Sequence, residues 1–105
     1  MLTFERGPDG RTLIVDGEVD LASADRLVDA VSRMLDGSPP RLDVRKVSFL
    51  DSTGVHALIR IARMQGGDVE LVAPSREVRR VLDLVGLDSG LPVRIVEEPS
   101  EGEPA

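Results

Sequence analysis

The sequence predicts an α/β fold with a largely parallel sheet, and two observations support this prediction. Beyond residue 16, short apolar runs typical of strands alternate with segments whose apolar residues recur every three or four positions, as on one face of a helix. Each predicted helix has a single apolar face, so it packs on a sheet rather than inside an all-helical core. A chain of 105 residues with 41% hydrophobic residues is long enough for one such domain.

The first predicted elements form a β-hairpin. Residues 2–6 and 11–16 have strand-like patterns, and residues 7–10 between them (Gly-Pro-Asp-Gly) are a strong turn signal. We expect residues 17–20 (Gly-Glu-Val-Asp) to form a loop after the second strand. The hairpin therefore adds an antiparallel pair to the sheet.

The first predicted helix covers about residues 23–35. Ser23 is a suitable N-cap, Gly37 is a suitable stop, and the Pro-Pro pair at residues 39–40 prevents the helix from resuming. The apolar stripe that defines this helix consists of Ala24, Leu27, Val28, Val31, Met34 and Leu35.

The middle of the chain predicts a strand–helix–strand unit. Residues 41–45 and 47–50 are strand-like and lead into a helix at about residues 53–65, which a Gly-Gly pair ends. Residues 69–73 then form the next strand. The buried stripe expected for this helix consists of Val55, Leu58, Ile59 and Ala62, with Ile61 beside it.

The last predicted elements are a helix at about residues 76–85, ended by Gly86, and a short strand at residues 92–97. We expect residues 98–105 to form a disordered acidic tail, because they carry almost no apolar surface. The folded domain then spans residues 1–97. The stripe of the last helix consists of Val78, Val81, Leu82 and Val85, all of which we expect to point into the core.

Composition excludes several classes of site. The chain has no cysteine and a single histidine, His56, so disulfides, zinc–thiolate sites, thiol catalysis and multi-histidine metal sites within the chain are excluded. We predict neither a metal site nor a cofactor. The net charge is −6 and aromatic residues are 2% of the chain, which argues against binding to nucleic-acid phosphates or stacking on bases.

The sequence also predicts no insertion into a membrane. No apolar run approaches the roughly 20 residues that a membrane span needs. The first residues lack the basic and apolar regions of a secretory leader. We therefore expect a cytoplasmic protein.

Residues 51–54 (Asp-Ser-Thr-Gly) form the most informative motif, between an apolar strand and an apolar helix. By local pattern alone the motif is a well-capped helix start, because Asp, Ser and Thr can all accept an orphan backbone N–H. One cap is sufficient, however, and here a carboxylate precedes two adjacent hydroxyls. A hydroxyl at a helix N-terminus is also a favourable place for a phosphate group.

A serine hydrolase built from Asp51, Ser52 and His56 is a sharper alternative. Ser52 and His56 are four residues apart and could share a helix face. The motif lacks the Gly-x-Ser-x-Gly pattern of a nucleophile elbow, and Asp51 adjoins Ser52 instead of being placed to orient an imidazole. The residues therefore favour a protein that is not an enzyme.

Three stretches together resemble the STAS domain in its single-domain form, the bacterial anti-sigma factor antagonist. They are residues 17–20 (Gly-Glu-Val-Asp), residues 48–54 (Ser-Phe-Leu-Asp-Ser-Thr-Gly) and residues 81–87 (Val-Leu-Asp-Leu-Val-Gly-Leu). The resemblance covers about residues 2–97. It implies a mixed four- or five-stranded sheet with helices packed mainly on one face.

The resemblance also implies a mechanism. In that family, an anti-sigma factor that is itself a serine kinase phosphorylates the serine after the motif aspartate, which is Ser52 here. The unphosphorylated protein binds the kinase and releases the sigma factor, the phosphorylated protein does not bind, and a phosphatase of the PP2C type resets the cycle. The family fold places Asp20 near the phosphoacceptor. The partner-binding residues that the resemblance implies are Asp20, Asp51, Ser52, Thr53 and Gly54.

Two further points bear on this interpretation. Thr53 replaces the serine found at this position in the commoner Asp-Ser-Ser-Gly motif, which makes Thr53 an alternative phosphoacceptor. We expect a side chain added at Gly54 to project toward the partner. Single STAS domains also resemble scaffold subunits of membrane-transport or signalling assemblies, in which phosphorylation is absent or secondary, and this is the alternative function.

Overall fold

The computed structural model describes residues 1–34, 39–86 and 90–97, and it has a five-stranded mixed sheet with three helices. The strands lie in the order β1-β2-β3-β4-β5; β1 is antiparallel to β2 and every later pair is parallel. The α/β prediction is confirmed. The elements in chain order are β1 (Leu2–Arg6), β2 (Thr12–Val19), α1 (Ala24–Ser32), β3 (Arg41–Leu50), α2 (Ser52–Gln65), β4 (Val69–Val72), α3 (Arg76–Val85) and β5 (Val93–Val96).

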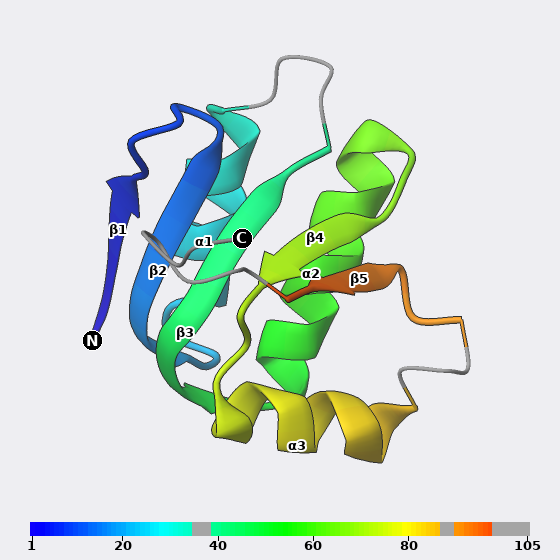
Figure 1. Ribbon diagram of the computed structural model, residues 1–105. Coiled ribbons are helices and arrows are strands. Elements are labelled where there is room, and N and C mark those ends of the chain that lie inside the picture. Colours follow the sequence, from blue (N-terminus) through cyan, green and yellow to red (C-terminus); the bar gives the residue numbers. More distant parts are fainter. Residues whose placement is uncertain (35–38, 87–89, 98–105) are drawn as a thin grey trace.

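Two of the helices cover one face of the sheet. Figure 1 shows α1 and α2 behind the strands, whereas α3 crosses below the end of β3. The buried side chains of the sheet and of these helices form one apolar core, as expected for a two-layer α/β domain. Its largest fully buried members are Leu2, Leu27, Leu42, Ile61, Leu71 and Leu82.

The strands β2 and β3 are longer than the sequence predicted. The expected loop at residues 17–20 is wrong, because β2 continues through Val19 and pairs with β3 as far as Leu50. The two runs predicted at 41–45 and 47–50 form a single strand. The β2–β3 pairing contains two register shifts, and the two strands remain paired beyond each of them.

Only the first three residues of β3 pair with β4, so the second half of β3 has a helix beside it in place of a strand. The Ser75 hydroxyl, at the start of α3, donates a 2.6 Å hydrogen bond to the carbonyl oxygen of Val47. The Ser75 amide donates to the carbonyl oxygen of Val44 at 3.3 Å. These bonds fix α3 against the part of β3 that leads into the 51–54 motif.

The helix predictions hold with local corrections. The helices α2 and α3 end at Gly66 and Gly86, as predicted, whereas α1 ends at Ser32, and the predicted stop at Gly37 lies outside the described residues. On α3, Val78 and Leu82 are buried, but Val85 is 45% exposed and does not reach the core. On α2, Ile61 is fully buried, whereas Ile59 is only partly buried. The predicted tail at residues 98–105 also lies outside the described residues.

Candidate functional site

The site lies where β2 and β3 end side by side. Val19 and Leu50 are paired in the parallel register, and the amide of Asp51 lies 3.4 Å from the carbonyl oxygen of Val19. Asp20 and Asp51, the next residue of each strand, therefore emerge at the same edge of the sheet. The carboxyl ends of parallel strands are where α/β domains usually place their functional residues.

Asp51 is the N-cap of α2. Its Oδ1 atom accepts hydrogen bonds from the amides of Thr53 at 2.9 Å and Gly54 at 3.1 Å, and it also accepts a short hydrogen bond from the Thr53 hydroxyl. The Thr53 hydroxyl, with the two amides, holds the pKa of the Asp51 carboxyl below its ordinary value of 3.8. Asp51 is therefore ionised at neutral pH.

The two hydroxyls of the motif are in different states. Ser52 is the first residue of α2 and is exposed, and its hydroxyl makes no hydrogen bond with any residue that the structure describes. The Thr53 side chain is partly buried, and its hydroxyl is held by the Asp51 carboxylate. The Ser52 hydroxyl is therefore accessible to solvent, whereas the Thr53 hydroxyl is engaged by the Asp51 carboxylate.

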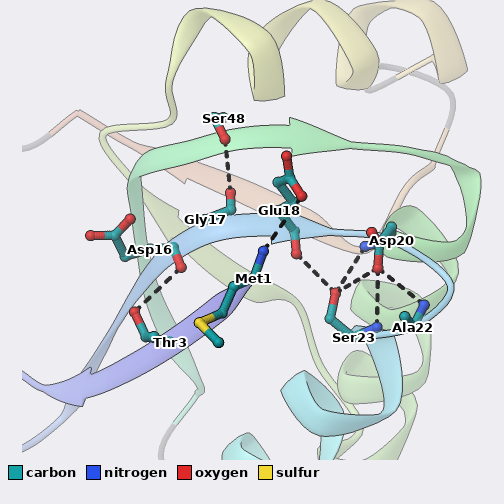
Figure 2. A network of polar contacts seen from close by, with 9 residues as sticks. All are labelled: Met1, Thr3, Asp16, Gly17, Glu18, Asp20, Ala22, Ser23 and Ser48. Atoms are coloured by element: carbon teal, nitrogen blue, oxygen red, sulfur yellow. Dashed lines mark hydrogen bonds and ion pairs between the residues drawn. The ribbon is translucent and has the colours of Figure 1, made fainter.

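Asp20 closes the turn that leads from β2 into α1. Its Oδ1 atom accepts hydrogen bonds from the amides of Ala22 at 3.0 Å and Ser23 at 3.1 Å, with the Ser23 hydroxyl also 3.0 Å away (Figure 2). The structure thus places Asp20 at the junction beside the 51–54 motif, in the neighbourhood that the family resemblance implied. It directs this carboxylate oxygen toward the start of α1.

Ser23 has a role that the sequence did not reveal. It occupies the N-cap position of α1 but makes no side-chain cap bond to that helix, so the predicted capping role is wrong. Its buried hydroxyl instead donates to the carbonyl oxygen of Glu18 at 2.8 Å and accepts from the amide of Asp20 at 3.0 Å (Figure 2). Ser23 therefore ties the end of β2 to the start of α1.

Gly17 sets the backbone path of β2 just before the site. Its φ is +121°, and a Cβ there would lie 1.9 Å from the carbonyl oxygen of Met1. Figure 2 shows the two flanking contacts: the Ser48 hydroxyl donates to the carbonyl oxygen of Gly17 at 3.3 Å, and the Met1 amino group lies 3.5 Å from the Glu18 carboxylate. Only glycine combines this backbone conformation with so close a neighbour.

Gly54 faces the core, and the expectation that a side chain added there would project toward a partner is wrong. Gly54 is buried, and a Cβ at this position would lie 2.3 Å from a methyl carbon of Leu50 and 3.0 Å from one of Val19. The first turn of α2 packs directly on the ends of β2 and β3. The absent side chain therefore permits this close packing.

The residues proposed for a serine hydrolase do not assemble. The Asp51 carboxylate is occupied by Thr53 and Gly54, and His56 is exposed without a hydrogen bond to Ser52 or Asp51. Among the residues that the structure describes, no group of three His, Asp or Glu side chains could hold a metal ion. Within the same described ranges, no helix is long and apolar enough to cross a membrane.

Two exposed apolar side chains flank the site and were missed by the sequence analysis. Leu21, directly after Asp20, is 79% exposed, and Phe49, two residues before Asp51, is 46% exposed. An apolar residue in a strand is ordinarily expected to be buried. Strict alternation of inward and outward side chains does not predict that Phe49 points outward, because the β2–β3 register shifts between Gly17 and Glu18, which pairs with Phe49. Exposed apolar side chains beside polar ones are common at protein–protein interfaces.

Comparison with known proteins agrees with this architecture. The anti-sigma-B factor antagonist of Listeria monocytogenes is 27% identical over 106 residues, covering 96% of this chain and 93% of that protein. RsfB, an anti-sigma-F factor antagonist of Mycobacterium tuberculosis, is 34% identical over 80 residues, covering 72% of this chain and 66% of that protein.

The fold also has a counterpart among solved structures. The anti-sigma factor antagonist SpoIIAA in its unphosphorylated form superposes with a TM-score of 0.66 at 23% identity, covering 93% of this chain and 90% of SpoIIAA. The family model of the STAS domain matches residues 4–98, which is nearly the whole chain. The chain therefore belongs to the STAS domain family.

Proposed function

We propose that the chain is an anti-sigma factor antagonist controlled by phosphorylation of Ser52. Its unphosphorylated form binds an anti-sigma factor that is also a serine kinase, and this binding frees the sigma factor. Phosphorylation of Ser52 ends the binding, and a PP2C-type phosphatase restores it. The names of the relatives from Listeria and Mycobacterium support the antagonist role.

The observation that carries the proposal is the state of the Ser52 hydroxyl. It is exposed at the first position of α2, while its neighbours Asp51 and Thr53 are bonded to each other. A kinase needs an accessible hydroxyl at a defined position, and the capped helix start supplies one on a rigid element. The same exposure makes a phosphate on Ser52 accessible to a phosphatase.

A phosphate on Ser52 would act mainly on the bound state. It adds about −1.5 to −2 charges beside the ionised Asp51 carboxylate and near the junction that carries Asp20. The N-terminus of α2 and the surrounding water offset this repulsion in the free protein. When a partner covers the site, the phosphate loses its water, and two unit charges about 5 Å apart repel by roughly 3 kcal/mol at an effective dielectric constant of about 20. That corresponds to about two decades in affinity.

In this proposal the chain acts as a binding protein and not as an enzyme. The side chains of Asp51 and Ser23 form hydrogen bonds with backbone groups, and the Ser52 side chain is exposed to solvent. We place the exchange in the cytoplasm, because a sigma factor acts there on transcription.

The proposal is tested with Ser52→Ala and Ser52→Asp, with Ser32→Ala as the control for loss of an exposed serine. Ser32 lies at the far end of α1, where its hydroxyl donates a 2.7 Å hydrogen bond to the carbonyl oxygen of Asp29 and to no other group among the described residues. The Ser52→Ala chain first serves as bait to identify the anti-sigma factor, which is then made as a pure protein. Titrations with ADP present, which has no γ-phosphoryl group to transfer to Ser52, measure the affinity of each variant in its unphosphorylated state. Mass spectrometry after a separate incubation with ATP locates the phosphate.

We expect wild type, Ser52→Ala and Ser32→Ala to bind the anti-sigma factor alike, and Ser52→Asp to bind at least tenfold more weakly. Phosphate appears on Ser52 in wild type and is absent from Ser52→Ala. Equal affinity of Ser52→Asp, or phosphate on Thr53 instead of Ser52, contradicts the proposed switch. Binding to a transport or signalling assembly without phosphorylation would support the scaffold alternative.

A further inference from the structure

A groove lies between the end of β3 and the outer side of α3, next to the candidate site. Figure 1 shows α3 crossing below the end of β3. Residues of these two elements line a hollow with a volume of about 450 Å³. Leu50, one of its lining residues, immediately precedes the Asp51 cap. The residues that line the groove are Ser48, Phe49, Leu50, Arg76, Glu77, Arg80 and Val81.

The groove has an apolar wall that includes one of the two phenylalanines of the chain. Phe49 is 46% exposed, and Val81, partly buried on α3, lines the same hollow. An exposed aromatic ring beside a partly open apolar side chain loses contact with water when a partner side chain fills the space. Aromatic side chains in such positions are common anchors of protein–protein interfaces.

The rim of the groove on α3 is basic, although the whole chain has a net charge of −6. Arg76 and Arg80 lie one helical turn apart, are exposed, and form no ion pair with any residue that the structure describes. Arg79 lies between them in the sequence, but its guanidinium group forms an ion pair with the Glu97 carboxylate at 2.6 Å. Glu77 is the acidic residue of the rim, so two arginines outnumber one carboxylate there.

We propose that this groove is a second contact surface for the anti-sigma factor, and that it accepts a segment carrying an acidic side chain next to an apolar one. The proposal rests on the proposed function, because it names the same partner. The acidic group pairs with Arg76 and Arg80, and the apolar side chain packs on Phe49. The groove adjoins the motif along the chain, because Leu50 lines it and Asp51 is the next residue, and we take this proximity to mean that one partner contacts both.

The two surfaces together give the complex an orientation. The Asp20 and Asp51 junctions favour a basic region of the partner, and the groove favours an acidic one. Opposite charges on neighbouring patches permit one docking direction and oppose its reverse. Because a phosphate on Ser52 changes only the first patch, the groove contributes to affinity in both phosphorylation states.

The test uses the purified anti-sigma factor identified with the Ser52→Ala bait and measures its affinity for Phe49→Ala and Arg80→Glu. The matched controls are Met64→Ala, which removes a side chain 43% exposed near the end of α2, and Arg11→Glu, an equal charge reversal in the β1–β2 turn. Circular dichroism and melting temperature establish that each variant is folded. Intact mass after incubation with ATP measures phosphorylation of Ser52, and light scattering measures oligomeric state.

We expect Phe49→Ala and Arg80→Glu to bind at least tenfold more weakly, with both controls within twofold of wild type. The Ser52→Asp change is expected to weaken each groove variant further. Unchanged affinity in folded Phe49→Ala and Arg80→Glu overturns the groove and leaves the proposed function intact. A wild-type dimer that these two changes dissociate assigns the groove to a second copy of the chain and overturns the proposal. If wild type binds no anti-sigma factor at all, the proposed function and the groove both fall.

Discussion

The amide of Asp51 lies 3.4 Å from the carbonyl oxygen of Val19, and this backbone contact joins the two junctions from which the site is built. On one side it continues into the Asp20–Ser23 turn, and on the other into the first turn of α2. A shift of the backbone at either junction therefore alters the position of the other. The candidate site is a property of the paired strand ends and not of the 51–54 motif alone.

The packing of α3 can be tested with a pair of leucines on opposite faces. Leu82 is 0% exposed, whereas Leu84, two residues later, is 80% exposed. We expect Leu82→Ala to lower the free energy of unfolding by about 2–5 kcal/mol, because a buried side chain leaves a cavity. Leu84→Ala changes it by about 0.5 kcal/mol or less. Equal effects in urea denaturation would mean that the buried face of α3 is assigned wrongly.

Gly54→Ala is expected to destabilise the protein. Alanine is favoured over glycine in a helix by about 1 kcal/mol, but overpacking a core costs about 1–3 kcal/mol. The new Cβ would press on Leu50 and Val19, so we expect a net loss of about 1 kcal/mol, or a melting temperature lower by about 4–8 °C.

Gly67→Ala is the control for this change, since the nearest atom to a Cβ there is 3.4 Å away, at the end of the Gln65 side chain. Its melting temperature is expected to stay close to that of wild type. A Gly54→Ala protein as stable as wild type would show that α2 shifts away from the strand ends without loss.

The ionised Asp51 carboxylate contributes stability that depends on pH. Its pKa in the folded protein lies below the ordinary value of 3.8, so the contribution is present above that value and is lost as the pH falls through the folded pKa. Asp51→Asn keeps a cap acceptor but removes this dependence. We expect the difference in unfolding free energy between the two proteins to be constant above about pH 5 and to shrink below pH 4.

This comparison also controls for other acids. Asp9 has a lowered pKa for a similar reason, hydrogen bonds from Arg11 and Thr12, but it is present in both proteins and cancels. A difference between wild type and Asp51→Asn that stays constant from pH 6 to pH 3 would contradict the capping role of the carboxylate.

The hydrogen bond from the Thr53 hydroxyl is the main cause of the low Asp51 pKa. Thr53→Val removes that hydroxyl and is expected to raise the pKa of Asp51 toward its ordinary value, whereas Thr53→Ser retains the donor and the low pKa. Carbon-detected NMR of the carboxyl group during a pH titration measures both. Identical titration curves for the valine and serine variants would show that the backbone amides alone hold the carboxylate.

Much of the fold was predictable because the patterns that specify it are local. The glycine ends of α2 and α3 can be read directly from residue spacing, and the structure confirms them. The stripe on α3 is confirmed for Val78 and Leu82 but not for Val85. The sequence also indicated that Asp51 could cap α2, and its Oδ1 atom does so. Local spacing predicts such features because the residues involved are neighbours in the chain.

The parts that could not be predicted depend on contacts between distant segments. Position 17 requires glycine because a Cβ there would collide with the carbonyl group of Met1. Position 54 requires glycine because a Cβ there would collide with the side chains of Leu50 and Val19. The outward position of Phe49 follows from irregular pairing between two strands. Neither a period of two nor a period of 3.6 contains this information.

The pairing of β2 with β3 has a consequence for when the site comes into existence during synthesis. The Ser48 and Gly17 contact spans 31 residues of sequence, and the intervening chain includes all of α1. Bringing the two ends of so long a segment together lowers the conformational entropy of the chain. This loss is offset only when β2 and β3 are both formed and paired. A growing chain that ends before α2 carries Asp20 but lacks Ser52. The Asp20 junction and the start of α2 therefore come together only after the chain has been made through the first turn of α2 and both strands are paired.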